Sequence, residues 1–474
     1  MPGSDEKNSP WLDLQLLNRL PADLRESRPE ASLAHFRVRL LKRTIEHAIG
    51  RSPHYRRQME AAGAALEILT AVKTHDDAST VERLIQAALA CLPFTRPDEL
   101  AAAPDDFLAV SQTEVEGVIS LPSSGSTGPV KRVYSSASDL ESTVDFFFHG
   151  MRGLVSLKNG DRAALMMSGD RPGSVGDLLS RAMARLRIPM MLAGFPPQEA
   201  GSRPTWLKKL IDWRPSCLVG LPRQVLELSR CRLAASLSPG LRTILLSGDV
   251  VAESARRHLA DALTAEVFIH YGLTEFGLGG AVECRERLGP HLREADLLVE
   301  IIGPDGRTVN EAGRRGEIVI TSLTRQAMPL LRYRTGDEGA FAPGPCACGS
   351  IMRRLLTFGR LADRISLADG RHLGLSDFEE ALLPLPFVRW FELTLHEDGL
   401  RPYLVLAASL AEPPPANALD LIAKALSGLS GLHPAANLEK TFPSALLPLL
   451  VTIADDSRKR NMTGKQTLKK ASPT

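Results

Sequence analysis

The stretch Ser123-Ser124-Gly125-Ser126-Thr127-Gly128-Pro129-Val130-Lys131 follows the apolar pair Val118-Ile119 and concentrates hydroxyl groups, glycines and one lysine. Glycines let backbone N–H groups approach the oxygens of a ligand, hydroxyls donate further hydrogen bonds, and a lysine supplies positive charge. This composition predicts a loop that wraps a polyphosphate. Loops rich in serine and threonine are common, so the interpretation depends on the polar motifs that follow.

Bulk composition limits the class of protein. The chain has 474 residues, more than one ordinary core accommodates, so we expect at least two domains. A hydrophobic content of 44% and a charged content of 24% are typical of a soluble globular protein. The formal net charge of +2 argues against a nucleic-acid partner, and no apolar run is long enough for a membrane span. Residues 1–7 lack a basic-then-apolar secretory pattern, so we expect a cytoplasmic protein. We expect a monomer or a homodimer.

Apolar periodicity predicts an α/β fold. Residues 1–30 are polar and proline-dotted, which favours a flexible segment, and residues 31–62 and 77–91 have helical periodicity. Between residues 133 and 345, short apolar strands alternate with helices, which predicts a large multi-layer domain with mostly parallel sheets. The expected strands cover residues 163–167, 243–246 and 266–269, and the expected helices cover residues 207–213 and 223–230.

A more β-rich portion follows, with strands expected at residues 298–302 and 317–321. The composition shifts near residues 344–359. Beyond it, helices at residues 376–382 and 416–426 and a strand at 402–407 suffice for a small α+β domain. We therefore expect a flexible segment at 1–30, a large domain at 31–358 and a C-terminal domain at 359–474.

A second polar motif, Tyr271-Gly272-Leu273-Thr274-Glu275, directly follows the strand expected at 266–269. Parallel sheets bind ligands at the carboxyl ends of their strands. Tyr271 can stack on a flat ring, Thr274 can bond a phosphate and Glu275 can hold Mg²⁺. Taken alone, the motif also fits a simple strand-to-turn segment.

Three further candidate site segments lie downstream. Tyr333-Arg334-Thr335-Gly336-Asp337 places a carboxylate after a tight turn, where it can accept both hydroxyls of a ribose, and Arg360 can reach a ribose or phosphate. Lys465 follows Gly464 on the tail and can stabilise charge that develops between a carboxylate and a phosphate. Each of these has a plain alternative: a turn, a charged linker and a solvated lysine.

Six cysteines in a chain of this length favour thiols or metal ligands over disulfides. Cys284 and His291, with Cys346 and Cys348, make a set of three thiolates and one imidazole, which suits a closed tetrahedral zinc shell. On the residues alone, buried free thiols remain an equal alternative. Cys91, Cys217 and Cys231 lie in apolar or helical surroundings and are expected to be core residues.

Four of these motifs resemble, in this order, the signatures of the adenylate-forming superfamily: the loop at residues 123–131, the segments at 271–275 and 333–337, and Gly359-Arg360. The closer resemblance is to the phenylacetate–CoA ligase family, over about residues 35–470. It rests on the segments Ser52-Pro53-His54-Tyr55-Arg56 and Leu92-Pro93-Phe94-Thr95, on Met328-Pro329-Leu330-Leu331-Arg332 before Tyr333, and on Pro345-Cys346-Ala347-Cys348-Gly349.

The resemblance implies an enzyme that activates a carboxylic acid with ATP and Mg²⁺ to an acyl or aryl adenylate and then transfers the acyl group to coenzyme A. It implies that residues 123–131 hold the triphosphate and that Ser247-Gly248-Asp249 lies against adenine. It further implies that Thr274 and Glu275 contact phosphate and Mg²⁺, that Asp337 binds ribose with Arg360 nearby, and that Lys465 is the adenylation lysine. It also favours a structural zinc on Cys284, His291, Cys346 and Cys348.

The sequence departs from the family at the junction to its C-terminal domain. Ala362 stands where the family usually has the first of two acids, and Asp369-Gly370-Arg371-His372 replaces a loop used in thiol transfer. Adenylation is therefore better supported than transfer to coenzyme A. Two alternatives stay open: an amine or carrier-protein acceptor, and a nucleotide-binding homologue without turnover.

Overall fold

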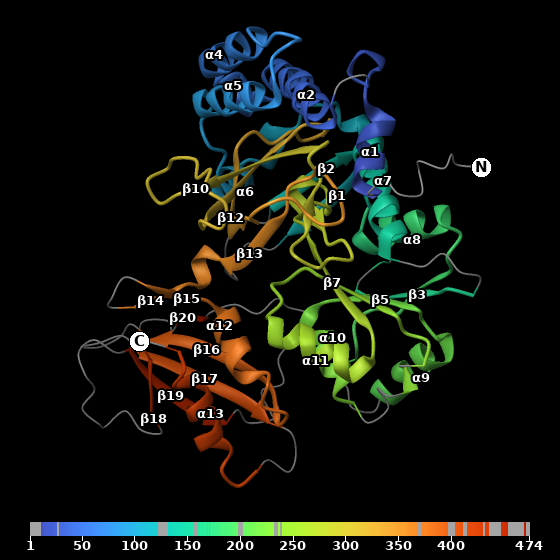
Figure 1. The fold of residues 1–474 in the computed structure, drawn as a ribbon, viewed down its shortest axis with the longest axis vertical. Helices are drawn as coiled ribbons and strands as arrows, with labels where there is room; N and C mark the ends of the chain where they lie inside the picture. The colour runs from blue at the N-terminus through green and yellow to red at the C-terminus, as the bar shows by residue number, and fades with distance from the viewer. Residues whose placement is uncertain are drawn as a thin grey trace. The chain divides into compact units, whose positions relative to one another are not determined.

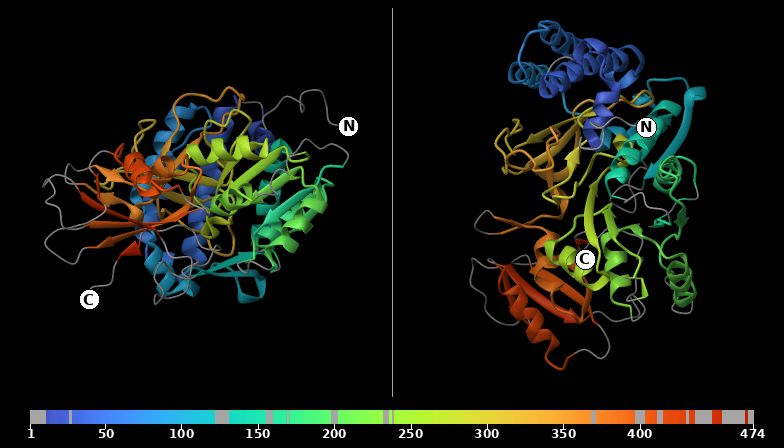
Figure 2. Two further views of the ribbon diagram at one scale, coloured as in Figure 1. Left: turned by 90° about the horizontal axis from the view of Figure 1, so that it is seen from below. Right: turned by 45° about the vertical axis from the view of Figure 1, so that its right-hand side comes forward.

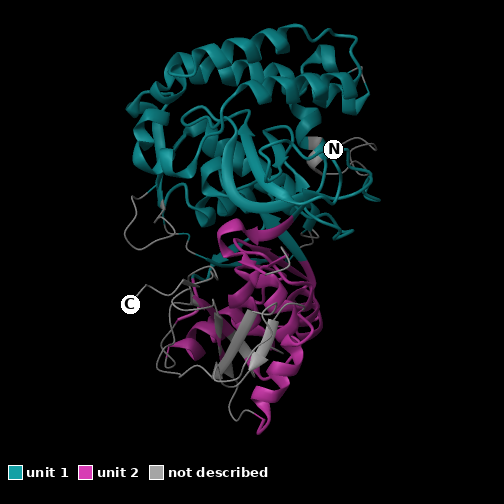
Figure 3. Ribbon diagram, turned by 90° about the vertical axis from the view of Figure 1, so that its left-hand side faces the viewer, with its two compact units in different colours: residues 1–194, 268–356 teal, residues 195–267, 357–474 magenta. Residues whose placement is uncertain are grey.

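The computed structural model describes residues 11–25, 28–121, 131–154, 160–167, 169, 171–197, 202–231, 236–237, 239–367, 371–396, 403–410, 415–429, 432–435, 447–453 and 469–470. Contacts divide the chain into two compact units, residues 1–194 with 268–356 and residues 195–267 with 357–474 (Figure 3). The predicted boundary between residues 358 and 359 lies two residues from the last boundary of these units. The predicted domains at 31–358 and 359–474 stay a prediction.

The first unit begins with helices that pack on one another, as Figures 1 and 2 show for α2 (Pro29–Arg51), α4 (Met59–Thr70) and α5 (Ala78–Cys91). The helix expected over residues 31–62 is wrong in its extent. It ends at Arg51, because Ser52 precedes a proline and takes an extended conformation with φ −85° and ψ 125°. Ser52 then caps the short helix α3 (Pro53–Arg56) by accepting a hydrogen bond from the Tyr55 N–H.

The flexible segment expected at residues 1–30 is also corrected over its described part. Residues Trp11–Arg19 form helix α1, and Ala22–Leu24 form a 3₁₀ turn, η2. Leu16, Leu20 and Leu24 are buried. The helical spacing of these leucines was not recognised because proline and polar residues lie between them. The leucine side chains pack into the first unit.

Parallel and antiparallel strands both occur in this unit. β3 (Ala163–Met166) runs parallel to β4 (Met190–Leu192), and β1 (Val115–Leu121) pairs antiparallel with β2 (Lys131–Ser136). The helices that accompany these strands, with short turns before them, are α6 (Pro97–Ala102), η3 (Pro104–Phe107), η4 (Gln112–Glu114), α7 (Ala137–Leu154) and α8 (Val175–Arg185).

The predicted β-rich portion is confirmed as antiparallel structure. β10 (Leu297–Ile302), β11 (Gly316–Ser322) and β12 (Tyr333–Phe341) are neighbours in one sheet, and β13 (Leu355–Arg360) follows. The end of β7 (Glu266–Tyr271) pairs antiparallel with β8 (Ala281–Val282), and β8 with β9 (His291–Leu292). The strand β7 thus carries the second sequence motif at its end, where the 3₁₀ turn η6 (Thr274–Phe276) follows.

The second unit contains a parallel pair and a mixed sheet. β5 (Cys217–Gly220) runs parallel to β6 (Thr243–Ser247), with helices α9 (Arg203–Trp213), α10 (Pro222–Ser229) and α11 (Glu253–Leu263). The mixed sheet has the order β18 (Leu432–Ala435), β19 (Leu447–Ile453), β17 (Tyr403–Leu410), β16 (Val388–His396), β20 (Lys469–Lys470).

Helices α12 (Leu375–Leu382) and α13 (Ala418–Leu426) share a hydrophobic cluster with this sheet, in which Phe378, Phe391 and Ile422 are buried. The remaining elements are η7 (Leu361–Asp363), β14 (Ile365–Ser366) and β15 (His372–Leu373). The predicted α/β class, with parallel strands and a small α+β region at the C-terminal end, is confirmed. No helix among the described residues has the length and apolarity of a membrane span.

Candidate functional site

Three of the sequence motifs meet in the first unit around the carboxylate of Glu275. Lys131, the first residue of β2, places its Nζ 3.2 Å from Glu275 Oε1. The hydroxyl of Tyr333, at the start of β12, donates a hydrogen bond of 3.0 Å to the same oxygen. Lys131 Nζ also donates to the Tyr333 hydroxyl at 3.3 Å. A lysine, a phenol and a carboxylate from distant segments therefore form one connected group.

A second hydrogen bond joins the motif at residues 271–275 to the motif at residues 333–337. The Tyr271 hydroxyl donates to Asp337 Oδ2 at 3.0 Å. Glu275 and Asp337 are mostly buried, with 6% and 8% of their surface exposed, whereas Lys131 and Tyr271 are half-buried. The two expected acidic residues are thus held in one region, each by a tyrosine hydroxyl.

Glycines make the turn that carries Glu275. A Cβ on Gly272 would lie 1.9 Å from the carbonyl oxygen of Leu278, so no other residue fits there without a shift of backbone. Gly277 ends η6 with φ +88°, a conformation that favours glycine. The loop between β7 and β8 consequently folds back tightly and presents Glu275 beside β12.

The turn at Asp337 is built by hydrogen bonds to β11. The Gly336 N–H donates to Glu317 Oε1 at 3.1 Å, and Gly336 has φ +73°. Thr335 donates through its hydroxyl to the Ile318 carbonyl at 2.7 Å and accepts from the Asp337 N–H at 3.0 Å. The Thr-Gly-Asp sequence therefore fixes the backbone direction at Asp337.

Behind Tyr271 lies a buried, uncharged histidine. Burial lowers the pKa of His270 to about 4, so the imidazole is neutral near pH 7. The rings of Phe146 and Phe147 lie 6.1 and 6.0 Å from its ring. A Cβ on Gly279 would come within 2.3 Å of Phe146, so helix α7 packs tightly under the loop.

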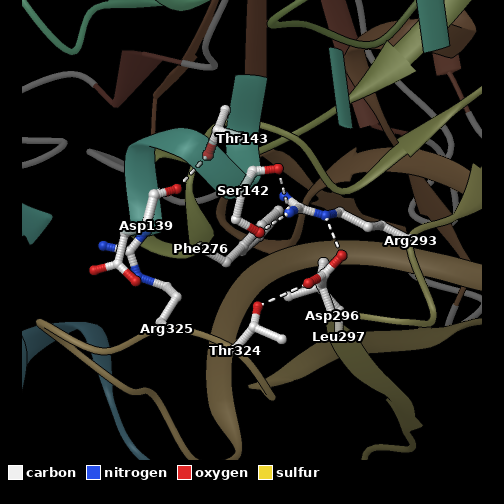
Figure 4. A pocket seen from close by; sticks show the side chains of 9 residues that line it. All are labelled: Asp139, Ser142, Thr143, Phe276, Arg293, Asp296, Leu297, Thr324 and Arg325. Carbon is white, nitrogen blue, oxygen red and sulfur yellow. Dashed lines mark hydrogen bonds and ion pairs between the residues drawn. The ribbon is translucent and has the colours of Figure 1, made fainter. Parts of the chain in front are cut away.

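A small polar pocket is lined in part by Phe276, the last residue of η6 (Figure 4). Arg293 donates to Asp296 Oδ2 at 2.7 Å and to the Ser142 carbonyl at 2.7 Å, and Thr324 donates to Asp296 Oδ1 at 2.8 Å. Burial alone would raise the pKa of Asp296, but Arg293 and Arg19 hold it below its usual value. These groups satisfy one another, which identifies the pocket as a structural network under the loop.

The predicted adenine segment and Arg360 belong to the second unit. Ser247 ends β6, Gly248 has φ +91°, and Asp249 Oδ1 accepts from the Val250 N–H at 2.9 Å. Arg360 ends β13 and is half-buried.

Helix α12 packs against the N-terminal end of α11 in the same unit. Glu380 accepts from the Ser254 N–H at 2.8 Å. Burial, followed by the charge of Asp249, raises the pKa of Glu379 to about 8.

Two expected parts of the site lie outside the described residues. These are residues 122–130, which include Ser123, Ser124, Gly125, Ser126, Thr127 and Gly128, and residues 454–468, which include Lys465. Their roles stay predictions from the sequence.

The expected metal ligands Cys284, His291, Cys346 and Cys348 do come together. Their four ligand atoms all lie within 4.8 Å of one another, and Cys284, His291 and Cys346 are buried. The sulfur atoms of Cys284 and Cys346 are 3.6 Å apart, and Cys348 Sγ is 3.4 Å from His291 Nε2. Zinc–sulfur bonds of about 2.3 Å at tetrahedral angles place two sulfurs about 3.8 Å apart, close to the observed spacing.

The surroundings of the cluster also suit a metal. His291 Nδ1 lies 2.8 Å from the Met352 carbonyl, a contact that assigns the proton to Nδ1 and leaves Nε2 to face the thiols. Burial raises the pKa of Cys284, and that of Cys348 to about 12. Thiolates form at such a place when a cation binds them, so these residues fit zinc in chemistry and spacing.

Sequence reasoning missed the contact of Tyr333 with Glu275. Tyr333 is 1% exposed, and from the sequence it had no predicted role of its own within its motif. A signal was present: Tyr271 and Tyr333 each precede an acid by four residues, so the two motifs share one pattern.

Comparison with known proteins places these features in a family. A family model described as AMP-binding enzyme matches residues 51–326. The phenylacetate–coenzyme A ligase of Thermus thermophilus is 26% identical over 400 residues, which cover 82% of this chain and 84% of that protein. The enzyme of the same name from Escherichia coli is 25% identical over 350 residues, covering 72% and 74%.

Solved structures share the fold. A 2-hydroxyisobutyryl-CoA ligase in a postadenylation state, in complex with R3-HIB-AMP, superposes with a TM-score of 0.74 at 18% identity, covering 95% of this chain and 90% of that one. ATP-bound MatB from Rhodopseudomonas palustris gives a TM-score of 0.53 at 16% identity, covering 76% and 68%.

Proposed function

The chain belongs to the family of AMP-binding enzymes, and from that premise we propose that it is an ATP-dependent acid–thiol ligase. In the first step, an oxygen of the substrate carboxylate attacks the α-phosphorus of ATP, and pyrophosphate leaves. In the second, the thiolate of coenzyme A attacks the carbonyl carbon of the acyl adenylate, and AMP leaves. The named relatives are phenylacetate–coenzyme A ligases, which favours an aryl or other apolar acid.

One observation carries the proposal: the group formed by Lys131, Glu275 and Tyr333, with Tyr271 and Asp337 beside it. A cation and two carboxylates, gathered from segments that are far apart in sequence, suit a bound metal–nucleotide complex. Magnesium, when bound, neutralises charge on the phosphates, and hard carboxylate oxygens such as those of Glu275 are its usual protein ligands.

The other roles follow the family pattern. Residues 123–131 hold the triphosphate, Thr274 bonds a phosphate, and Asp337 accepts the ribose hydroxyls with Arg360 nearby. Ser247, Gly248 and Asp249, together with Tyr271 and Gly272, receive the adenosine. Lys465 stabilises the charge that develops between carboxylate and α-phosphate, on a C-terminal domain at residues 359–474 that moves between the two steps. The use of ATP and coenzyme A fits a cytoplasmic place of action.

A panel of aryl, alkyl and hydroxy acids tests this function. Each acid is incubated with ATP and Mg²⁺, with and without coenzyme A, and acyl adenylate, acyl-CoA and pyrophosphate are measured by mass spectrometry and a coupled assay. We expect at least one acid to give adenylate alone and thioester when coenzyme A is present. Adenylate without thioester would favour an amine or carrier-protein acceptor, and absence of product with every acid would contradict the proposal.

The lysine assignment has its own matched pair of variants. Lys465→Ala should slow adenylate formation about 10²- to 10³-fold, as loss of one charge-stabilising group does, while ATP affinity changes little. Lys469→Ala, a lysine four residues further along the tail, should leave the rate unchanged. Equal rates in both variants would remove Lys465 from the catalytic step.

The Cys/His cluster supports a second, structural role for metal. Four protein ligands fill a tetrahedral shell, so zinc there has no open position for substrate. We expect about one zinc per chain by elemental analysis, in keeping with the one four-ligand cluster found among the described residues. A folded, active protein that holds no metal would refute this assignment.

A further inference from the structure

The second and third motifs hold each other's acids. In Tyr271-Gly272-Leu273-Thr274-Glu275 and in Tyr333-Arg334-Thr335-Gly336-Asp337, the tyrosine stands four residues before the acid. Each hydroxyl bonds not to its own motif's acid but to that of the other: Tyr333 to Glu275 and Tyr271 to Asp337, both at 3.0 Å. The arrangement is reciprocal, so the two carboxylates are placed relative to one another by two phenols.

The bonds to Glu275 occupy only one of its oxygens. Lys131 Nζ and the Tyr333 hydroxyl both end on Oε1. Oε2 has no hydrogen-bond partner among the described residues. A carboxylate with one oxygen fixed and the other open is arranged to bind a cation through the open oxygen.

The two donors to Oε1 differ in kind. Lys131 is a flexible, half-buried cation that can turn toward a phosphate, and while it stays paired it opposes the binding of a second cation. Tyr333 is neutral, so it orients the carboxylate without cancelling its charge. When a nucleotide draws Lys131 away, the phenol remains as the fixed contact.

The backbone around Tyr333 is rigidly held. Thr95 is fully buried, and it bonds on both sides of Tyr333: its N–H donates to the Arg332 carbonyl at 3.0 Å, and its carbonyl accepts from the Arg334 N–H at 2.9 Å. The Tyr55 hydroxyl accepts from the Leu331 N–H at 2.9 Å. The sequence segments around Tyr55 and Thr95, to which the proposed reaction gives no role, thus support the strand that carries Tyr333.

We propose that the two tyrosines are positioning residues for each other's motif: Tyr333 sets Glu275 for the metal that accompanies ATP, and Tyr271 sets Asp337 for the ribose. This inference rests on the proposed function, because it takes Glu275 and Asp337 as the metal and ribose contacts. Removal of the Tyr333 hydroxyl should therefore affect binding of the metal, and removal of the Tyr271 hydroxyl should affect binding of the ribose.

Binding measurements test the proposal without turnover. The affinity of Mn²⁺ is measured by electron paramagnetic resonance in the presence of saturating α,β-methylene-ATP, and calorimetry compares α,β-methylene-ATP with its 2′-deoxy form. We expect Tyr333→Phe to weaken Mn²⁺ about ten-fold, as loss of a hydrogen bond to a charged group does, and to leave the preference for the ribose hydroxyl unchanged. Tyr271→Phe should reduce that preference about ten-fold and leave Mn²⁺ affinity unchanged.

Tyr55→Phe is the matched control. Tyr55 is as buried as Tyr333, lies in the same hydrophobic cluster and bonds to Leu331 just before β12, but it is hydrogen-bonded to neither carboxylate. It should lower the melting temperature and change neither binding constant. If all three variants, or none, shift both constants, the tyrosines are merely structural and the proposal is overturned.

The outcome separates this inference from the proposed function. A wild-type protein that binds metal–nucleotide and forms product, with unshifted constants in both tyrosine variants, contradicts only the inference. A wild-type protein that binds no nucleotide contradicts the proposed function and the inference together. If Tyr333→Phe does not fold, the Tyr271→Phe result alone decides. An unchanged preference for the ribose hydroxyl in Tyr271→Phe would show that Tyr271 does not position Asp337, and it would overturn the proposal.

Discussion

The first unit contains two groups of polar side chains gathered from distant segments, and they differ in what they leave open. In the Cys/His cluster, four ligand atoms face one another within 4.8 Å, and three of the four residues are buried. At Glu275, two donors converge on one carboxylate oxygen and leave the other unbonded among the described residues. A group that closes on itself stabilises the fold, whereas a group that is half satisfied is arranged for a ligand.

The largest expected effect comes from removing one ligand of the Cys/His cluster. Cys346→Ser removes a thiolate, and loss of a metal present at a thousand times its dissociation constant costs about 4 kcal/mol of stability. We expect the variant to lack zinc by elemental analysis and to melt at a lower temperature, while its adenylation rate per folded molecule stays near wild type. Cys91→Ser, which alters a thiol outside the cluster, should keep both zinc and melting temperature. Zinc retained in full by Cys346→Ser would mean that the cluster is not the metal site.

A smaller effect is expected at the second carboxylate of the open group. Asp337→Asn keeps the size of the side chain and its contact with Tyr271 but loses the charge that strengthens hydrogen bonds to a ribose. The KM for ATP should rise about ten-fold, and kcat should change less, because this contact is made in both ground and transition states. Steady-state pyrophosphate release measures both constants. A change confined to kcat would contradict a role in ribose binding.

The smallest effect extends the comparison to the second unit, where the carboxyl of Glu379 lies near the charge of Asp249. Burial and that charge raise its pKa to about 8, above its value of 4.5 in an unfolded chain. The folded state therefore binds the proton more tightly, so stability is full below about pH 4.5 and falls as the pH rises toward 8. Glu379 is partly exposed, and solvent screening limits the effect to at most about 1 kcal/mol.

Glu379→Gln should remove this pH dependence. Chemical denaturation between pH 5 and 9, a range that spans the raised pKa of Glu379, should show the variant gaining stability over wild type as the pH rises. Glu380→Gln removes a neighbouring charge that makes only a minor contribution to the raised pKa of Glu379, so it should keep most of the wild-type slope. Parallel curves for Glu379→Gln and wild type would show that the carboxyl titrates normally.

The sequence predicted this comparison only in part. Cys284, His291, Cys346 and Cys348 could be grouped because thiols and imidazoles are few and their chemistry is specific. Glu275 and Asp337 could be assigned from their motifs. The contacts between the motifs could not, because they depend on how η6 lies against β12, which is set by the packing of the whole unit.

Local patterns of apolar residues predicted several helices and strands correctly. The helix over residues 77–91 and the strands near residues 298–302 and 317–321 are observed as expected, and the structure adds that the two strands pair antiparallel. The helix over residues 31–62 was extended too far, although Pro53 marks its end, and the leucines of residues 11–24 were overlooked within a polar segment. Periodicity reports which face is apolar, but it does not show what that face packs against.

The measurement that bears most directly on the account is the acid-dependent exchange of labelled pyrophosphate into ATP by Glu275→Gln, with Glu283→Gln as the control. Glu283 is another buried glutamate of the same region, and its carboxylate accepts backbone hydrogen bonds from Ile269 and Gly289. We predict that Glu275→Gln slows exchange about 10²- to 10³-fold at an unchanged melting temperature, because an open carboxylate at the nucleotide has lost its charge. Glu283→Gln should lower the melting temperature and keep the rate. Undiminished exchange by folded Glu275→Gln would contradict the claim that this carboxylate serves the reaction.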